Sequence, residues 1–237
     1  MADQVEGPAS FSALWDALLP IGRDARTGGY RRFAWTAEDL ACREWFTDGA
    51  AARGMAVHSD RNGNLWAWWG PPGRGAVVLG SHLDSVPDGG AYDGPLGVVS
   101  AFAALDVVRA AAPAAEPRRP VAVVAFADEE GARFGVACAG SRLLTGALDP
   151  DRARALTDTD GVSMAEAMRA AGHYPGRLGR DDEALGRIGR FVELHVEQGR
   201  ALVHVDAPVG VATAIWPHGR YRFTFTGEAN HAGTTRL

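Results

Sequence analysis

Two continuous apolar segments with a helical segment between them constrain the fold of this chain most strongly. Residues 76–80 (AVVLG) and 121–127 (VAVVAFA) are apolar without alternation, and residues at about 95–111 are rich in Ala, Val and Leu. Unbroken apolar strands are typical of a parallel sheet covered on both faces, and a helix supplies the crossover between such strands. We therefore expect an α/β fold with a largely parallel sheet covered by helices.

Further elements are expected around this strand–helix–strand unit. The segment at 36–53 opens at Thr36 with Asp39 three residues later, a variant of the capping box that starts a helix. Helices are predicted at 10–20, 36–53, 139–148 and 163–171, and a surface loop at 172–190. Strands are predicted at 55–60 and 65–70 as a hairpin, and at 191–197, 209–216 and 220–227.

Composition excludes several classes of function. The 24 basic residues are all arginine, so a phosphate loop with lysine, a Schiff-base lysine and a lysine base are excluded. Two cysteines, Cys42 and Cys138, are too few for a disulfide framework or a thiolate zinc site. A net charge of −5 and short apolar runs give no support to a nucleic-acid or membrane partner. We expect a cytoplasmic protein.

Four clusters of side chains that bind metals lie at or just beyond predicted strand ends, where open α/β sheets gather their ligands. Each cluster alone also has an ordinary interpretation, such as a loop histidine, an Asp-Gly turn, acids at a helix start or a core histidine. Together they match a site for two divalent ions. The clusters are His82 with Asp84, Asp93 among glycines, Asp128-Glu129-Glu130, and His195 on one strand face with Glu193 and Glu197.

Such a site needs carboxylates in two roles. One carboxylate bridges the ions, holds them about 3.5–4 Å apart and positions a shared water. A neighbouring carboxylate that binds neither ion can accept the proton of that water as a general base. Glu129 and Glu130 suit this division, because adjacent side chains point in different directions and one can bind metal while the other faces substrate.

Four ordered motifs carry a resemblance to a known family: GSHLDSVPDGGAYDGPLGV, FADEEGARFG, ELHVEQG and GEANHAGTTRL. They resemble the dinuclear metal amidohydrolases of the allantoate amidohydrolase and N-carbamoyl-L-amino-acid hydrolase (hydantoinase/carbamoylase) family, relatives of aminoacylases and zinc carboxypeptidases. The resemblance runs from about residue 10 onward. It implies a zinc-exopeptidase-like catalytic domain over residues 1–210, followed at 211–237 by the start of a smaller α+β dimerisation or lid domain.

The resemblance also implies a set of metal ligands for two ions, zinc or manganese. His82 and His195 would bind one ion, Asp93 would bridge both, and Glu130 would bind the other. A histidine at position 195, where the peptidase relatives have a carboxylate, favours ureido or carbamoyl substrates over peptides.

The remaining site residues are assigned by the same resemblance. Glu129 would be the general base, and Asp84 would support His82. Gln198, Asn230 and His231 match positions that contact substrate, the histidine by reaching an active site across a homodimer. As an alternative, His231 in Asn-His-Ala-Gly caps a turn.

The reaction implied is hydrolysis of a linear C–N amide bond, with the ureido group of allantoate as the expected substrate and ammonia as a product. The alternatives are N-carbamoyl-L-amino-acid hydrolase or β-ureidopropionase activity, which use the same site. Members of this family are longer, and their last metal-ligand histidine and a substrate-binding arginine have no match here. We therefore expect a C-terminally truncated chain, and an inactive remnant is the alternative to an enzyme.

Overall fold

The computed structural model describes most of the chain as two compact units, Met1–Val196 and Glu197–Leu237. The residues described are 10–113, 116–216, 219, 223–231 and 233–235. None of the helices in these ranges is long and apolar enough to cross a membrane. The domain boundary expected at residue 210 stays a prediction.

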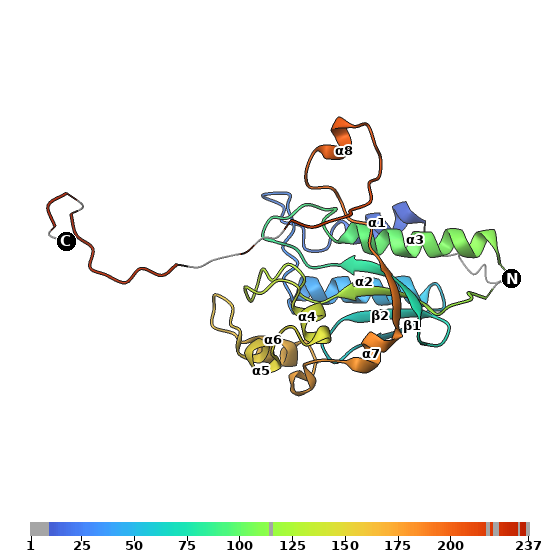
Figure 1. Ribbon diagram of the computed structural model, residues 1–237, viewed down its shortest axis with the longest axis horizontal. Coiled ribbons are helices and arrows are strands. Elements are labelled where there is room, and N and C mark those ends of the chain that lie inside the picture. The colour runs from blue at the N-terminus through green and yellow to red at the C-terminus, as the bar shows by residue number, and fades with distance from the viewer. Residues whose placement is uncertain (1–9, 114–115, 217–218, 220–222, 232, 236–237) are drawn as a thin grey trace. The chain divides into compact units, whose positions relative to one another are not determined.

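The first unit is built on a five-stranded sheet with the strand order β1-β2-β4-β3-β5 (Figure 1). Strand β3 pairs in parallel with β4 and β5, which confirms the parallel arrangement expected for the two apolar segments. The β1–β2 hairpin is also confirmed, and β2 runs antiparallel to β4, so the sheet is mixed. The strands are β1 Ala56–Ser59, β2 Leu65–Trp69, β3 Ala76–His82, β4 Val121–Phe126 and β5 Ile188–Val192.

Helices cover both faces of this sheet. On one face, Leu14 of α1, Phe46 of α2 and Phe102 of α3 pack against Val123 of β4, and α1 runs beside α3 (Figure 1). The helices of the first unit are α1 Phe11–Leu18, α2 Ala37–Ala51, α3 Pro95–Ala111, α4 Ala139–Thr145, α5 Pro150–Ala155, α6 Met164–Ala170, the 3-10 helix η1 Pro175–Arg177 and α7 Asp182–Arg187. In the second unit, α8 spans Ala201–His204.

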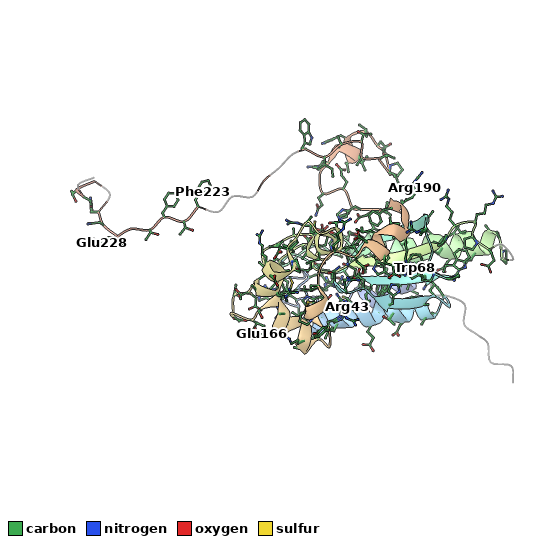
Figure 2. The ribbon with its side chains drawn as sticks, turned by 60° about the horizontal axis from the view of Figure 1, so that its bottom comes forward. Arg43, Trp68, Glu166, Arg190, Phe223 and Glu228 are labelled. Atoms are coloured by element: carbon green, nitrogen blue, oxygen red, sulfur yellow. The ribbon has the colours of Figure 1, made fainter. Side chains whose placement is uncertain are left out.

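The opposite face of the sheet is covered by α4 and α7. Leu144 of α4 and Ala184 of α7 pack against Trp66 and Trp68 of β2, and Trp68 lies inside the packed unit (Figure 2). The continuous apolar sequences of the central strands are explained by these two layers, since alternate side chains face different helices.

Local sequence signals set the helix starts correctly. Thr36 is the N-cap of α2, and its side chain accepts a hydrogen bond from the Asp39 amide. Ser163 and Glu166 form a complete capping box at the start of α6. These side chains satisfy backbone N–H groups that have no partner within the helix.

The expected strand at 191–197 and the loop at 172–190 are wrong in their bounds. The segment expected to be a loop contains η1 and α7. Strand β5 follows α7 directly, so pairing with β3 begins already at Ile188. Pairing between β5 and β3 ends at Val192, so His195 lies beyond the strand instead of within it. The sequence pattern of α7 is weak, because the helix is short and contains Gly and Arg. Capping by Asp181 and packing of Ala184 stabilise it more than helix propensity does.

The strand expected at 209–216 is not formed, and the described part of the one expected at 220–227 is not a strand either. Residues 209–216 and 223–227 have no regular structure, and 220–222 lie outside the described residues. The alternating sequence at 220–227 fits a strand, but a strand requires a neighbour to pair with. The described part of the second unit contains only the helix α8.

Two glycines at the start of α3, Gly94 and Gly97, lie close to other parts of the chain. Gly94, the N-cap of α3, has a φ of +85°, and a Cβ there would lie 2.5 Å from the His82 ring. At Gly97 a Cβ would lie 2.5 Å from the carbonyl oxygen of Leu194. Glycine at these positions therefore lets α3 start directly against the ends of β3 and the segment after β5.

Replacing Gly94 by alanine tests this close approach. We expect Gly94→Ala to lower the free energy of unfolding by about 1–3 kcal/mol, because it adds a left-handed alanine and a clash with a buried ring. Gly90→Ala is the matched control in the same loop, since its added Cβ meets nothing within 4 Å and its φ is not in the left-handed region. Equal denaturation midpoints for the two variants would contradict the interpretation.

Candidate metal centre

His82 is the last residue of β3 and the most buried histidine of the cluster. Its Nδ1 lies 3.1 Å from the carbonyl oxygen of Asp84 and 3.5 Å from that residue's Oδ1. With the ring proton on Nδ1, His82 donates to Asp84 and keeps the lone pair of Nε2 for another partner. Nε2 points toward the Glu129 carboxylate, 3.6 Å from its Oε2. A histidine oriented through one nitrogen and open at the other is typical of a metal ligand.

The Asp84 carboxylate connects the loop after β3 with the turn after β4. Oδ1 accepts a hydrogen bond from the Glu129 amide at 3.1 Å, and Oδ2 accepts one from the Glu130 amide at 2.9 Å. Both oxygens are buried, so these bonds act in a medium that screens them little. One aspartate thus fixes the position of both glutamates and of His82.

The turn at residues 127–129 is held from its other side by the start of α4. The amides of Cys138, Ala139 and Gly140 donate to the carbonyl oxygens of residues 129, 128 and 127, at 2.5, 2.9 and 2.9 Å. Asp128 has a φ of +50°, which turns the chain sharply at the end of β4. This backbone bonding makes the turn rigid on both sides.

The other three predicted metal ligands gather around His82. One group of ligand atoms within 4.8 Å of each other comes from His82, Asp93 and His195. The Nε2 atom of His195 lies 3.2 Å from Oδ1 of Asp93. A second such group comes from His82, Glu129 and Glu130. The two groups share His82, so all of these ligand atoms lie around one side chain. The assignment of each residue to an ion stays a prediction.

The charges in this cluster favour a cation. Burial lowers the pKa of His82, but the hydrogen bond to Asp84 and the charges of Asp84, Glu129 and Glu130 outweigh it and raise that pKa to about 9. Burial, with the nearby charges of Asp93, Glu129 and Asp84, raises the pKa of Glu130 to about 7 although His82 opposes the shift. Carboxylates that repel each other around imidazole nitrogens form a donor set that fits divalent ions.

Two contacts in the site were missed by the sequence analysis. The Ser81 hydroxyl donates to Oε1 of Glu193 at 2.5 Å, and the Cys138 thiol donates to Oε1 of Glu129 at 3.2 Å. Glu193 therefore bonds to β3 instead of flanking His195 on a strand face. No local pattern could have predicted the Cys138 contact, because it depends on the fold of the turn nine residues away.

The other predicted residues lie in the second unit. The carboxylate of Glu197 accepts hydrogen bonds from the amides of Ala201 and Leu202 at the start of α8. Asn230 Oδ1 accepts from the amide of His231, whose Nδ1 accepts from the Gly233 amide at 3.1 Å. This local bonding agrees with a turn-capping histidine. Substrate contact by Gln198, Asn230 and His231 stays a prediction.

Comparison with known proteins identifies relatives for the unit that carries this cluster. The family model Peptidase family M28 matches residues 64–185, just over half of the chain. An N-carbamoyl-L-amino acid amidohydrolase of Geobacillus stearothermophilus is 38% identical over 228 residues, which cover 94% of this chain and 55% of that protein. An allantoate amidohydrolase of Escherichia coli (strain K12) is 39% identical over 226 residues, which cover 93% and 53%.

Solved structures agree with the sequence matches. A hydantoinase/carbamoylase family amidase from Burkholderia ambifaria superposes with a TM-score of 0.70 at 34% identity, over 83% of this chain and 48% of that one. The chain thus spans about half the length of the relatives it matches. The chain belongs to peptidase family M28, and its relatives are the amidohydrolases of the hydantoinase/carbamoylase family.

Proposed function

We propose that this chain carries the metal-binding part of an amidohydrolase that cleaves the linear C–N amide bond of a ureido or carbamoyl substrate. The observation that supports this best is the pair of ligand groups sharing His82, one of which contains the Glu129 carboxylate, 34% exposed. A partly exposed carboxylate at a cation site can reach both water and substrate. The amidohydrolase names of the relatives agree with this proposal.

Two divalent ions fit the donors present. His82, Asp93 and His195 would hold one ion, and Glu130 with Asp93 would hold the other. Imidazole nitrogens combined with carboxylate oxygens suit zinc and manganese alike. Divalent ions at such a site supply Lewis acidity, which polarises a carbonyl group and acidifies water.

Glu129 would carry the proton during hydrolysis. Cys138 holds its Oε1, and Oε2 faces the cluster beside His82. In this position the carboxylate would accept a proton from the attacking water and donate it to the leaving nitrogen. Asp84 bonds to the amides of Glu129 and Glu130 and would act through them as a positioning residue.

We propose allantoate as the substrate, with ammonia released from its ureido group. N-carbamoyl-L-amino acids and β-ureidopropionate are the alternative substrates. Ureidoglycolate is a further candidate, because one relative, from Arabidopsis thaliana, is named ureidoglycolate hydrolase. Similar identities to relatives named for allantoate and for N-carbamoyl-L-amino acids do not separate these substrates. Ammonia release measured side by side from the four compounds would rank them.

Replacing Glu129 by glutamine tests the base. We expect Glu129→Gln to reduce ammonia release by about 10²–10⁴-fold, because the amide cannot accept the proton, while the divalent metal content after dialysis stays unchanged. Glu44→Gln, an exposed glutamate on α2, is the control and should keep full activity. Unchanged ammonia release by Glu129→Gln would contradict the role. A metal-loaded wild-type chain without turnover would support the inactive-remnant alternative.

Replacing Asp84 by asparagine tests the positioning role. In Asp84→Asn one oxygen becomes an NH₂ group facing a backbone amide, so we expect a loss of about 1–3 kcal/mol in unfolding free energy of the metal-free chain. Metal affinity should fall about 10–100-fold. Asp88→Asn is the control in the same loop, because Asp88 is exposed and its side chain bonds, among the described residues, to Thr27 and Arg31. Equal loss of metal affinity in both variants would argue against the role of Asp84.

A further inference from the structure

A small cavity lies behind the turn that carries Glu129 and Glu130. Its volume is about 10 Å³, and Asp128 and Trp35 supply polar groups to its wall. Most of the remaining wall is apolar, as at Leu143, Met164 and Met168. The cavity is separate from the metal ligands, and the proposed function does not explain it.

Asp128 places a carboxyl group in this wall without a protein partner. The residue is 4% exposed, and neither Oδ1 nor Oδ2 has a hydrogen-bond partner among the described residues. Its backbone carbonyl accepts a hydrogen bond from the Ala139 amide at 2.9 Å, which holds the residue in the turn. A buried carboxyl group without a hydrogen bond carries a large desolvation cost.

Trp35 presents the complementary group. Its indole Nε1 is buried and likewise lacks a partner in the described part of the chain. The Arg43 guanidinium lies 4.4 Å from the centroid of the Trp35 ring, and the centroid of the His173 ring lies 4.8 Å from it in a T-shaped contact. A Cβ on Gly63 would lie 2.3 Å from Cη2 of Trp35, so the ring is packed on that side as well.

Asn62, the other polar side chain in the wall, is already paired. Its Nδ2 donates to the carbonyl oxygen of Gly179 at 2.9 Å, and its Oδ1 accepts from the Gly179 amide at 2.8 Å. The unpaired polar side-chain atoms in the wall are therefore one donor, on Trp35, and two acceptors, on Asp128. A bound water needs a volume of about 10–15 Å³ and two to four polar partners, and the cavity meets both conditions.

We infer that a single water molecule is bound in this cavity, where it accepts a hydrogen bond from Trp35 Nε1 and donates to the Asp128 carboxyl group. The water joins the residue before the N-cap of α2 to the turn after β4. It pairs the indole N–H and one carboxyl oxygen, two of the three side-chain atoms in the wall that have no partner among the described residues. The turn that holds Glu129 and Glu130 is thereby supported from behind as well as by Asp84.

A high-resolution crystal structure of the wild-type chain tests the inference directly. We expect one density peak at about 2.7–3.2 Å from both Trp35 Nε1 and an Asp128 oxygen. An empty cavity, or a direct hydrogen bond between the indole and the carboxyl group, would overturn the inference. This measurement needs no variant, so a variant that fails to fold does not affect it.

Double-mutant cycles test the same link in solution. Trp35→Phe removes the indole N–H, and Asp128→Leu replaces the carboxyl group by an apolar group with the same branching. If the water joins them, the effects of these two substitutions on the unfolding equilibrium constant should depart from additivity by about tenfold. Trp68→Phe is the matched control, because the Trp68 indole N–H is also buried and unpaired among the described residues but does not line the cavity.

The control cycle distinguishes a specific link between Trp35 and Asp128 from a general effect of removing a buried indole N–H. Trp68→Phe combined with Asp128→Leu should be additive within about twofold, since the two sites share no partner. Coupling confined to the Trp35 cycle supports the water bridge. Additivity in both cycles, or equal coupling in both, would overturn it.

Discussion

The candidate site depends on one buried carboxylate, that of Asp84. Its two oxygens accept the amides of Glu129 and Glu130, while its carbonyl oxygen and carboxylate orient His82. Parallel strands alone place their ends at one edge of a sheet but do not fix the side chains that follow them. The aspartate supplies that fixation, because two charge-assisted hydrogen bonds in a buried place are worth more than ordinary ones.

This arrangement places several carboxylates close together, and their mutual repulsion does not stabilise the fold. Glu130 has a raised pKa, and the pKa of the buried Asp128 is well above its usual value because burial penalises the charged form. A chain that keeps several carboxylates close together loses stability unless a cation or a proton neutralises them. The cluster is therefore best explained as a site whose negative charge would be balanced by bound cations. Without cations, the hydrogen-bonded turns around the cluster would hold the carboxylates together against their repulsion.

The sequence predicted the central part of the fold well and its periphery poorly. The apolar segments at 76–80 and 121–127 were decisive, because a near-continuous apolar run is typical of a strand that is buried on both faces. The ligands after those strands could be placed for the same reason. His195 was placed within a strand because periodicity does not show where pairing ends, which depends on the partner β3.

Tertiary contacts explain the other differences between sequence and structure. The hydrogen bonds from Ser81 to Glu193 and from Cys138 to Glu129 join residues that are close together only in the folded chain.

The position of His195 after β5 has a kinetic consequence. In the described sheet β5 is the last strand and pairs only with β3, so its amides should exchange with solvent sooner than those of β4. Opening of this edge would carry His195 away from His82, and the residence time of a shared ion would then follow the opening rate of the edge.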